Sequence, residues 1–285
     1  MYVPDVALPR LEAASGQSET SEVIAWRPAV PGIAEVFHAR FTDHAYPMHT
    51  HDSWKLLLVD VGAVRYDLDR HPNAASPAQV TLLPPHVPHD GRAATPDGFR
   101  KRVLYLDDDV VGADLIGAAV DRPAMPDAVL RHRVHELHES LTEPGEDLQA
   151  QCRLAFVAEQ LRRHLRRVPA PAARRDPGVA VALRELLDAR TPAGLRLDEA
   201  SRLLGASPTH LVRAFTLEYG IPPHRYLTGR RVDLARQLLL DGRPPAEAAV
   251  AAGFYDQAHL TRHFRRTVGT SPARFVRPSR NTSPG

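Results

Sequence analysis

The last third of the chain contains one pattern of residues twice, and this repeat constrains the fold more than any other feature. The first copy, from His210 to Phe215, reads HLVRAF, and the second, from His259 to Phe264, reads HLTRHF. Each copy is preceded by an alanine and a glycine with four residues between them. Each is followed by a glycine, a proline, an arginine and an aromatic residue at identical distances. A pattern that recurs after about 50 residues predicts two copies of one small structural unit.

Each copy has the composition of two helices joined by a tight turn. Gly205 and Gly253 fall where a chain that leaves a helix needs a positive φ. Ser207 and Asp256 stand where the next helix needs a side chain that caps its first N–H groups. The second helix of each copy contains a leucine and a phenylalanine four positions apart, which share one face and would be buried. This is the pattern of a helix-turn-helix unit, whose second helix enters the major groove of DNA.

The second helices present other side chains away from this apolar face, and these are candidate DNA contacts. They are Thr209, His210, Val212 and Arg213 in the first copy and Gln257, Ala258, His259, Thr261, Arg262, Arg265 and Arg266 in the second. An arginine can bind guanine O6 and N7 together, and a glutamine can bind adenine in the same way. We assign Arg265 and Arg266, one turn further along, to phosphates. The alternative is that these are solvated faces of a helical bundle, and two matching copies make it less favoured.

The charge of the chain is divided unevenly along its length. Residues 179–285 hold 16 arginines and 9 acidic residues, a net charge of +7, whereas residues 1–178 carry −5. A basic domain behind an acidic one indicates a polyanion as the partner of the back domain. Only two of the 36 basic residues are lysines, Lys55 and Lys101, which is typical of GC-rich codon usage. The abundance of arginine alone is therefore weak evidence for nucleic-acid binding.

One segment of the second copy carries a specific resemblance. The stretch from Ala252 to Phe275, AGFYDQAHLTRHFRRTVGTSPARF, resembles the signature segment of the AraC/XylS family of bacterial transcription regulators. The resemblance implies a DNA-binding domain of two helix-turn-helix units joined by a long helix, here at 223–240. It also implies a sequence-specific transcription regulator. Ala258 and His259 depart from the family pattern, in which larger polar residues or serine are common, so the base that this helix reads stays open.

The front of the chain shows a different pattern. Short apolar runs at 55–61, 64–68, 80–83 and 102–106 are broken by glycine, proline and asparagine, which predicts a β-sandwich or barrel. The segments PMHTHD at 47–52 and LLPPHVPHD at 82–90 resemble the cupin barrel that many AraC-type regulators use as a sensor domain. The resemblance implies an effector-sensing barrel.

The cupin resemblance places three histidines together at the mouth of this barrel. His49, His51 and His89 match three of the four ligand positions of metal-binding cupins, but Lys55 stands where the fourth, a glutamate, is expected. Lysine is a poor metal ligand at neutral pH. Three interpretations remain: histidines that support the barrel by hydrogen bonding, histidines that contact an organic effector with Lys55, or a three-histidine metal site. Further pocket candidates from strand alternation are Trp54, Tyr66 and Arg102.

The chain is thus predicted to be an α+β multidomain protein. Its parts are a flexible arm at 1–22, a cupin-like barrel at 23–125, a helical region at 126–167, a linker at 168–178 and the DNA-binding domain at 179–285. Apolar stripes on helices near 127–141 and 146–167 predict a homodimer, and the alternative is that these stripes are buried wholly against the barrel of the same chain. His132, His135 and His138 on the first of these helices are interpreted as a solvated face rather than a metal site.

Several classes of protein are disfavoured by composition. No window is apolar enough for a transmembrane helix, and no secretory signal is recognisable at the N-terminus. The single cysteine, Cys152, excludes a disulfide framework and fits the cytoplasm.

We expect a cytoplasmic transcription regulator and no enzyme. Its expected partners are double-stranded DNA and a small-molecule effector, with RNA polymerase as a further candidate, and no cofactor is expected. The alternatives are a cupin-type metalloenzyme, similar to a dioxygenase, fused to a DNA-binding domain, and a DNA-binding protein without sequence preference. The effector, the operator and the sign of regulation stay open.

Overall fold

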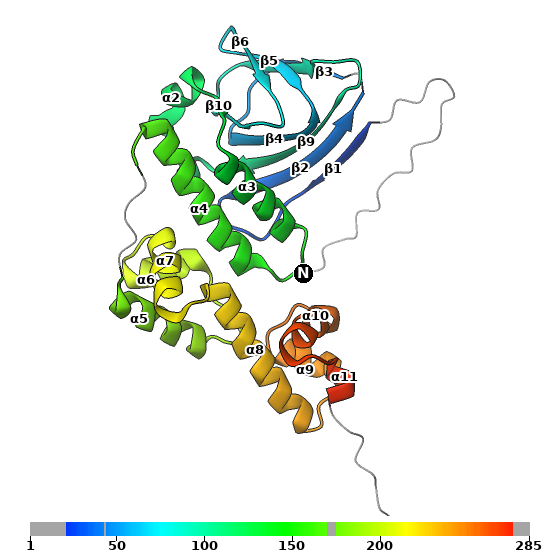
Figure 1. Ribbon diagram of the computed structural model, residues 1–285, viewed down its shortest axis with the longest axis vertical. Coiled ribbons are helices and arrows are strands. Elements are labelled where there is room, and N and C mark those ends of the chain that lie inside the picture. The colour runs from blue at the N-terminus through cyan, green and yellow to red at the C-terminus, as the bar shows by residue number, and fades with distance from the viewer. Residues whose placement is uncertain (1–20, 43, 170–174, 276–285) are drawn as a thin grey trace, which may run out of the picture.

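The computed structural model describes residues 21–42, 44–169 and 175–275. Most of the predicted arm and part of the predicted linker lie outside these ranges. The N-terminal part folds into two antiparallel sheets that face each other (Figure 1). One sheet has the order β1-β2-β9-β4-β7-β10 and the other β3-β8-β5-β6. The strands are β1 (Glu22–Trp26), β2 (Ile33–Phe41), β3 (Ala45–His49), β4 (Trp54–Gly62), β5 (Val64–Leu68), β6 (His71–Ala75), β7 (Val80–Leu83), β8 (His89–Ala93), β9 (Phe99–Leu106) and β10 (Ala124–Met125).

Both faces of the larger sheet are buried, and strand alternation decides which side chain lies on which face. In β4, Leu57 and Val59 point into the space between the two sheets, whereas Leu56 and Leu58 point to the outer face under the helices. Two sequence-based pocket candidates are wrong for this reason. Trp54 is fully buried on the outer face, and Arg102 is paired with Asp60 next to it in the sheet.

Two antiparallel helices cover the outer face of the larger sheet. The N-terminal helices are α1 (Asp108–Val111), η1 (Ala113–Leu115), α2 (Ile116–Asp121), α3 (Ala128–Leu141) and α4 (Asp147–Arg166). The carboxylate of Asp127 caps α3 by accepting a hydrogen bond from the Leu130 N–H. The solvated histidine face predicted for this helix is wrong at His138, which is buried and lies within hydrogen-bonding distance of His38 (3.2 Å). His132 and His135 are exposed as expected.

The C-terminal part is helical and contains the two predicted helix-turn-helix units. Its helices are α5 (Pro177–Ala189), α6 (Leu197–Leu204), α7 (Pro208–Tyr219), α8 (Pro223–Leu240), α9 (Pro245–Ala251), α10 (Gln257–Val268) and α11 (Pro272–Phe275). Ser207 and Asp256 cap α7 and α10, as predicted. Gly253 has a φ of +87°, and a Cβ there would lie 2.1 Å from the carbonyl oxygen of Pro192. Only glycine fits this turn.

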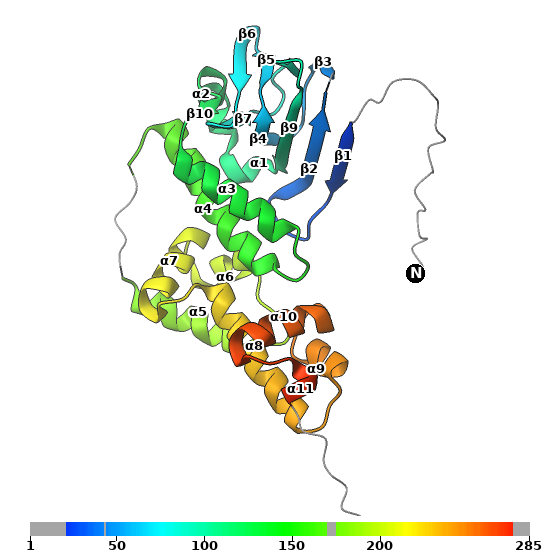
Figure 2. The ribbon, with the colours of Figure 1, turned by 45° about the vertical axis from the view of Figure 1, so that its right-hand side comes forward.

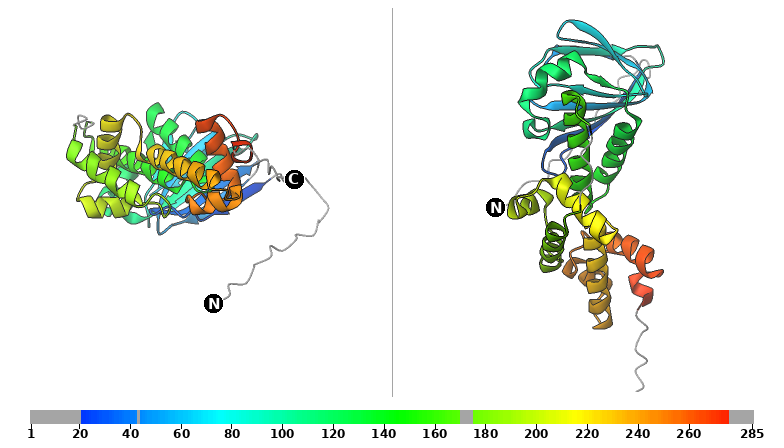
Figure 3. Two further views of the ribbon diagram at one scale, coloured as in Figure 1. Left: turned by 90° about the horizontal axis from the view of Figure 1, so that it is seen from below. Right: turned by 60° about the vertical axis from the view of Figure 1, so that its left-hand side comes forward.

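Helix α4 belongs to both halves of the molecule. Leu154, Val157 and Leu161 pack into the core that α4 shares with the larger sheet. Cys152 and Phe156 instead pack against the first helix-turn-helix unit. In the side views α3 and α4 lie between the barrel and the C-terminal helices (Figures 1, 2 and 3). No helix among the described residues is long and apolar enough to cross a membrane.

Candidate nucleic-acid interface and sensor site

The two second helices, α7 and α10, place Arg213 and Arg262 at equivalent positions of the repeat. Neither guanidinium is free. One nitrogen of Arg213 donates to both carboxylate oxygens of Glu159 on α4, at 3.0 Å each. The same guanidinium lies 5.3 Å from the ring centre of Phe156. The first helix-turn-helix unit is therefore tied to the helix that also supports the barrel.

Arg262 makes the corresponding contact in the second unit. Its guanidinium pairs with Glu143 and Glu146, which lie in the turn between α3 and α4. The ring of His263 also lies 2.8 Å from a Glu146 oxygen. Burial alone would raise the pKa of the Glu146 carboxyl, but hydrogen bonds from His259 and His263 hold it well below its usual range. We call Arg213–Glu159 and Arg262–Glu143/Glu146 the interdomain ion pairs.

The carboxylate of Glu146 also lies close to two histidine rings, and this cluster is better described as hydrogen-bonded than as a metal site. Glu146, His259 and His263 have ligand atoms within 4.8 Å of one another. The Arg262 guanidinium, however, binds the same Glu146 oxygen. The Tyr255 N–H points at Nδ1 of His259, so this nitrogen accepts, and Nε2 faces Glu146 as the donor. A cation would have to displace the Arg262 guanidinium from Glu146 and the N–H of His259 that faces the same carboxylate.

The structure corrects the predicted orientation of three candidate DNA contacts. Thr209, Val212 and His259 are buried rather than turned outward. The hydroxyl of Thr209 donates to the carbonyl of Ala155 on α4, and Val212 packs in the core that includes Phe156. The sequence pattern of the repeat alone could not reveal that other parts of the chain cover these three side chains. It comes from α4 and the α3–α4 turn, which belong to the other half of the chain.

The remaining candidates stay accessible. Gln257, Ala258, Thr261, Arg262 and Arg265 line a shallow hollow on α10. Arg266 is exposed. His210 is partly exposed, and its ring lies 2.9 Å from the carboxylate of Asp176. The reading role of each residue stays a prediction.

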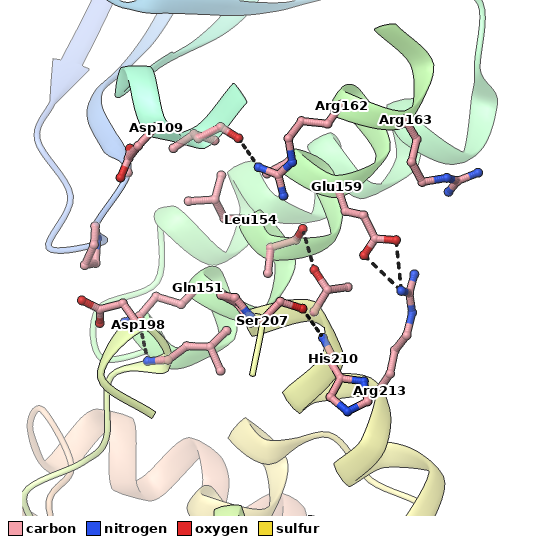
Figure 4. A pocket seen from close by; sticks show the side chains of 18 of the residues that line it. Asp109, Gln151, Leu154, Glu159, Arg162, Arg163, Asp198, Ser207, His210 and Arg213 are labelled. Carbon is pink, nitrogen blue, oxygen red and sulfur yellow. Dashed lines mark hydrogen bonds and ion pairs between the residues drawn. The ribbon is translucent and has the colours of Figure 1, made fainter. Parts of the chain in front are cut away.

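A cavity of about 1140 Å³ lies where the two halves meet (Figure 4). Its walls come from α4, α1, the chain at Pro31 and Gly32, and the start of α7, and the Arg213–Glu159 pair lies at its border. Gln151 accepts a hydrogen bond from the Leu197 N–H across the junction at 2.7 Å. The contact between the halves thus combines an apolar core around Cys152 and Phe156 with polar links that border the cavity.

The barrel brings the three predicted histidines together at its mouth. The ring centres of His49 and His51 lie 4.6 and 5.1 Å from that of His89. Nδ1 of His49 and of His89 each donates to a backbone carbonyl, which leaves Nε2 of both rings as acceptors. Burial, and then the charge of Lys55, lowers the pKa of His51 to about 3 and that of His89 to about 4. The rings of His51 and His89 are therefore neutral at physiological pH.

The donor set does not fit a complete cupin metal site. His49 and His89 fit it, because ligating rings ordinarily donate their second N–H to a carbonyl, and His51 lies beside them. Lys55 does not fit, because its side chain occupies the fourth position and its positive charge opposes a divalent cation as it opposes protonation of His51 and His89. We derive no metal chemistry for this barrel.

A second buried lysine was missed by the sequence analysis. Lys101 on β9 and Lys55 on β4 are only 4% and 6% exposed, and both point between the two sheets with Phe99 and Val103. Arg102, the residue chosen from the sequence, lies one position further and therefore on the opposite face. The available signal was the alternation of Phe99, Val103 and Tyr105, which places every odd-numbered residue of β9 inside.

The comparisons with known proteins agree with both halves. A model of the AraC-like ligand binding domain matches residues 32–158, and a model of a helix-turn-helix domain matches residues 200–278. The HTH-type transcriptional regulator YbfI of Bacillus subtilis is 28% identical over 75% of this chain and 81% of its own length. The chain belongs to the AraC family of transcriptional regulators.

Other transcriptional activators match over part of the chain or at lower identity. The virulence regulon transcriptional activator VirF of Yersinia enterocolitica is 32% identical over 32% of this chain and 34% of its own length. The crystal structure of the AraC-like transcriptional activator CuxR covers 75% of this chain and 80% of its own, at 16% identity and a TM-score of 0.41. The matches to the two family models assign a cupin-like ligand-binding domain and a helix-turn-helix DNA-binding domain to this regulator.

Proposed function

We propose that this regulator binds specific DNA sequences through α7 and α10, and that its sensor domain restrains both helices through the interdomain ion pairs. The observation that carries the proposal is the equivalence of Arg213 and Arg262. Both occupy the same position of the repeat, and carboxylates of the sensor half hold both. An arginine that binds a carboxylate is not available for guanine or phosphate. The described arrangement is thus the restrained one.

An effector in the barrel changes the balance between the restrained and the released arrangement. A ligand can do this only if it binds the two arrangements with different affinity. A physical route for such a difference exists. Lys55 and Lys101 point into the barrel, and Leu56 and Leu104 of the same two strands pack on the outer face in the core that contains α3 and α4. A small shift of β4 or β9 would therefore move α4, the helix that carries Glu159.

The arrangement of the two units predicts the shape of the DNA site. The two second helices enter successive major grooves on one face of the duplex, about 34 Å or 10 base pairs apart. A hydroxyl-radical footprint should show two short protected elements for each protomer. One protected element for each protomer, or protection that moves with every DNA fragment tested, would contradict the proposal.

A homodimer remains part of the proposal, although its expected surface is smaller than the sequence suggested. The apolar residues of α4 pack inside the chain, so the outer side of α3, where Val129 is 56% exposed, is what remains. Two copies on one operator bind with higher avidity than one. On operator DNA, light scattering should give a mass that exceeds that of the DNA by twice the 31.4 kDa of the chain. A mass of one chain, with and without DNA, would exclude the dimer.

The metalloenzyme alternative rests on the convergence of the three histidines alone. It requires a transition metal in the purified protein, in spite of Lys55. Metal analysis of protein prepared without chelators decides between the two functions. One equivalent of iron, nickel or zinc in the parent protein that is lost in His89→Ala would favour the enzyme. Protein that is purified from metal-supplemented cultures without bound metal would favour the regulator.

A further inference from the structure

The two buried lysines of the barrel are the only lysines of the chain. The other 34 of its 36 basic residues are arginines. Both lysines lie inside the same barrel, on the neighbouring strands β4 and β9. Codon usage explains why surface cations are arginines, but it does not explain why both exceptions lie in one place in the core. A requirement for an amine at these two positions does explain it.

Neither amine has a polar partner among the described residues. No ion pair and no hydrogen bond of Lys55 or Lys101 occurs in the parts of the chain that the structure covers. The ammonium of Lys101 lies 4.0 Å from the ring centre of Tyr46, and that of Lys55 lies 5.7 Å from it. The rings of Phe37 and Phe99 lie 5.6 Å from the ammonium of Lys101. Such aromatic contacts are weak in comparison with a carboxylate.

Polar atoms near the two amines also lack hydrogen-bond partners among the described residues. The hydroxyl of Tyr46 and Nε2 of His89 are buried without a hydrogen-bond partner. Buried polar groups in folded proteins are almost always satisfied, and a cluster of exceptions calls for a specific explanation. The two amines and the hydroxyl of Tyr46 are donors that share one missing partner, a negatively charged group with oxygen atoms. Nε2 of His89 is an acceptor, so it faces the N–H groups of the amines rather than the anion.

We propose that the barrel binds a small organic carboxylate whose charged group lies between Lys55 and Lys101. This inference rests on the proposed function in one respect, namely that the barrel is the effector site. A neutral sugar or an aromatic hydrocarbon would leave two buried amines unpaired, whereas a carboxylate pairs with both. Phe37 and Phe99 lie beside Lys101 and provide an apolar surface for the rest of the ligand. His49 and His51 are partly exposed, so the ligand can enter past them.

The choice of lysine over arginine fits a site that is empty for part of the time. A buried amine can lose its proton when no anion is present, which a guanidinium cannot do. Burial lowers the pKa of Lys55 to about 8, and burial together with the charge of Lys55 lowers that of Lys101 to about 6. The titratable groups that surround the two amines are Tyr46, His49, His51, His89 and Tyr105. A bound carboxylate should raise the pKa of both lysines.

Because the chain has two lysines, their side chains can be observed directly. The full-length protein is produced with lysine that carries ¹³C and ¹⁵N in its side chain, which gives two sets of signals. Lys55→Met and Lys101→Met assign them. Acetate, succinate and benzoate are the probes, and acetamide, succinamide and benzamide are their uncharged controls. Sodium chloride at matched ionic strength controls for screening.

We expect at least one carboxylate to shift both sets of signals in a saturable way and to raise the pKa of Lys101 by at least one unit, while its amide does neither. The proposal is overturned if the carboxylates act no differently from chloride or from the amides. It is also overturned if Lys101→Met keeps the full response at Lys55. DNA binding is measured on the same samples. Specific DNA binding with silent lysines would reject the carboxylate alone, whereas a lysine response without specific DNA binding would reject the proposed function alone.

The stability of two variants gives an independent test. Lys101→Met should raise the melting temperature, because methionine fills a similar volume and needs no partner. Lys101→Arg should lower it, because the guanidinium keeps its charge in the same place. A lower melting temperature for Lys101→Met than for the parent would mean that the amine makes stabilising native contacts, and it would contradict the inference.

Discussion

Removing the Arg213–Glu159 pair and the Arg262–Glu146 contact should increase the affinity of the full-length protein for its operator by about 30-fold. The variant is Glu146→Gln with Glu159→Gln, which leaves the size of both side chains unchanged. Hydrogen bonds to charged groups contribute roughly 1.5–3 kcal/mol when buried, but exposed pairs contribute only about 0–1 kcal/mol. The carboxylates of Glu146 and Glu159 are 12% and 17% exposed, and the arginines 44% and 26%. We therefore assign about 1 kcal/mol to each pair, and every 1.4 kcal/mol is tenfold.

The control for this experiment is Glu139→Gln. Glu139 is an exposed residue of α3, and its side chain forms no ion pair with the described residues of the C-terminal half. It removes one negative charge from the same half of the chain, whereas the double variant removes two. We expect it to change the affinity for operator and random DNA equally and slightly. If Glu139→Gln and the double variant behave alike, the gain arises from net charge and the sensor domain does not restrain α7 and α10.

Replacing Arg213 or Arg262 by alanine should cost about 1–3 kcal/mol on the operator and relax the base preference at one position each. The measurement belongs in the Glu146→Gln/Glu159→Gln background. In the parent protein the same substitution also removes an interdomain ion pair, and the two effects on affinity have opposite signs. A binding assay with a randomised operator library reports the base preference directly.

Arg266→Ala is the contrasting variant. Arg266 is exposed on the last turn of α10, and we assign it to a phosphate. Its loss should weaken binding to operator and random DNA by the same factor and reduce the slope of affinity against salt concentration by about one. If all three variants lost affinity with the base preference intact, α7 and α10 would hold the DNA backbone only, and the assignment of reading roles would be wrong.

The C-terminal half was predictable because its signals are local. Ser207 and Asp256 cap the helices that they precede in the sequence, and Gly253 closes a turn between neighbours. A cap or a glycine turn depends on residues a few positions apart, so a repeat of such signals specifies the helices on its own. For the N-terminal half, the sequence predicted the class of fold, a cupin-like barrel. Its histidines met as expected from the resemblance to cupins.

The sequence by itself determined the two helix-turn-helix units, the barrel and the family, because each follows from short-range patterns. Only the tertiary structure decided that Arg213 and Arg262 pair with Glu159, Glu143 and Glu146, since these partners lie 54 to 119 positions away. Only strand register decided that Lys101 rather than Arg102 points into the barrel. A shift of one residue along a strand moves a side chain to the opposite face, and the sequence of β9 has a cation on both.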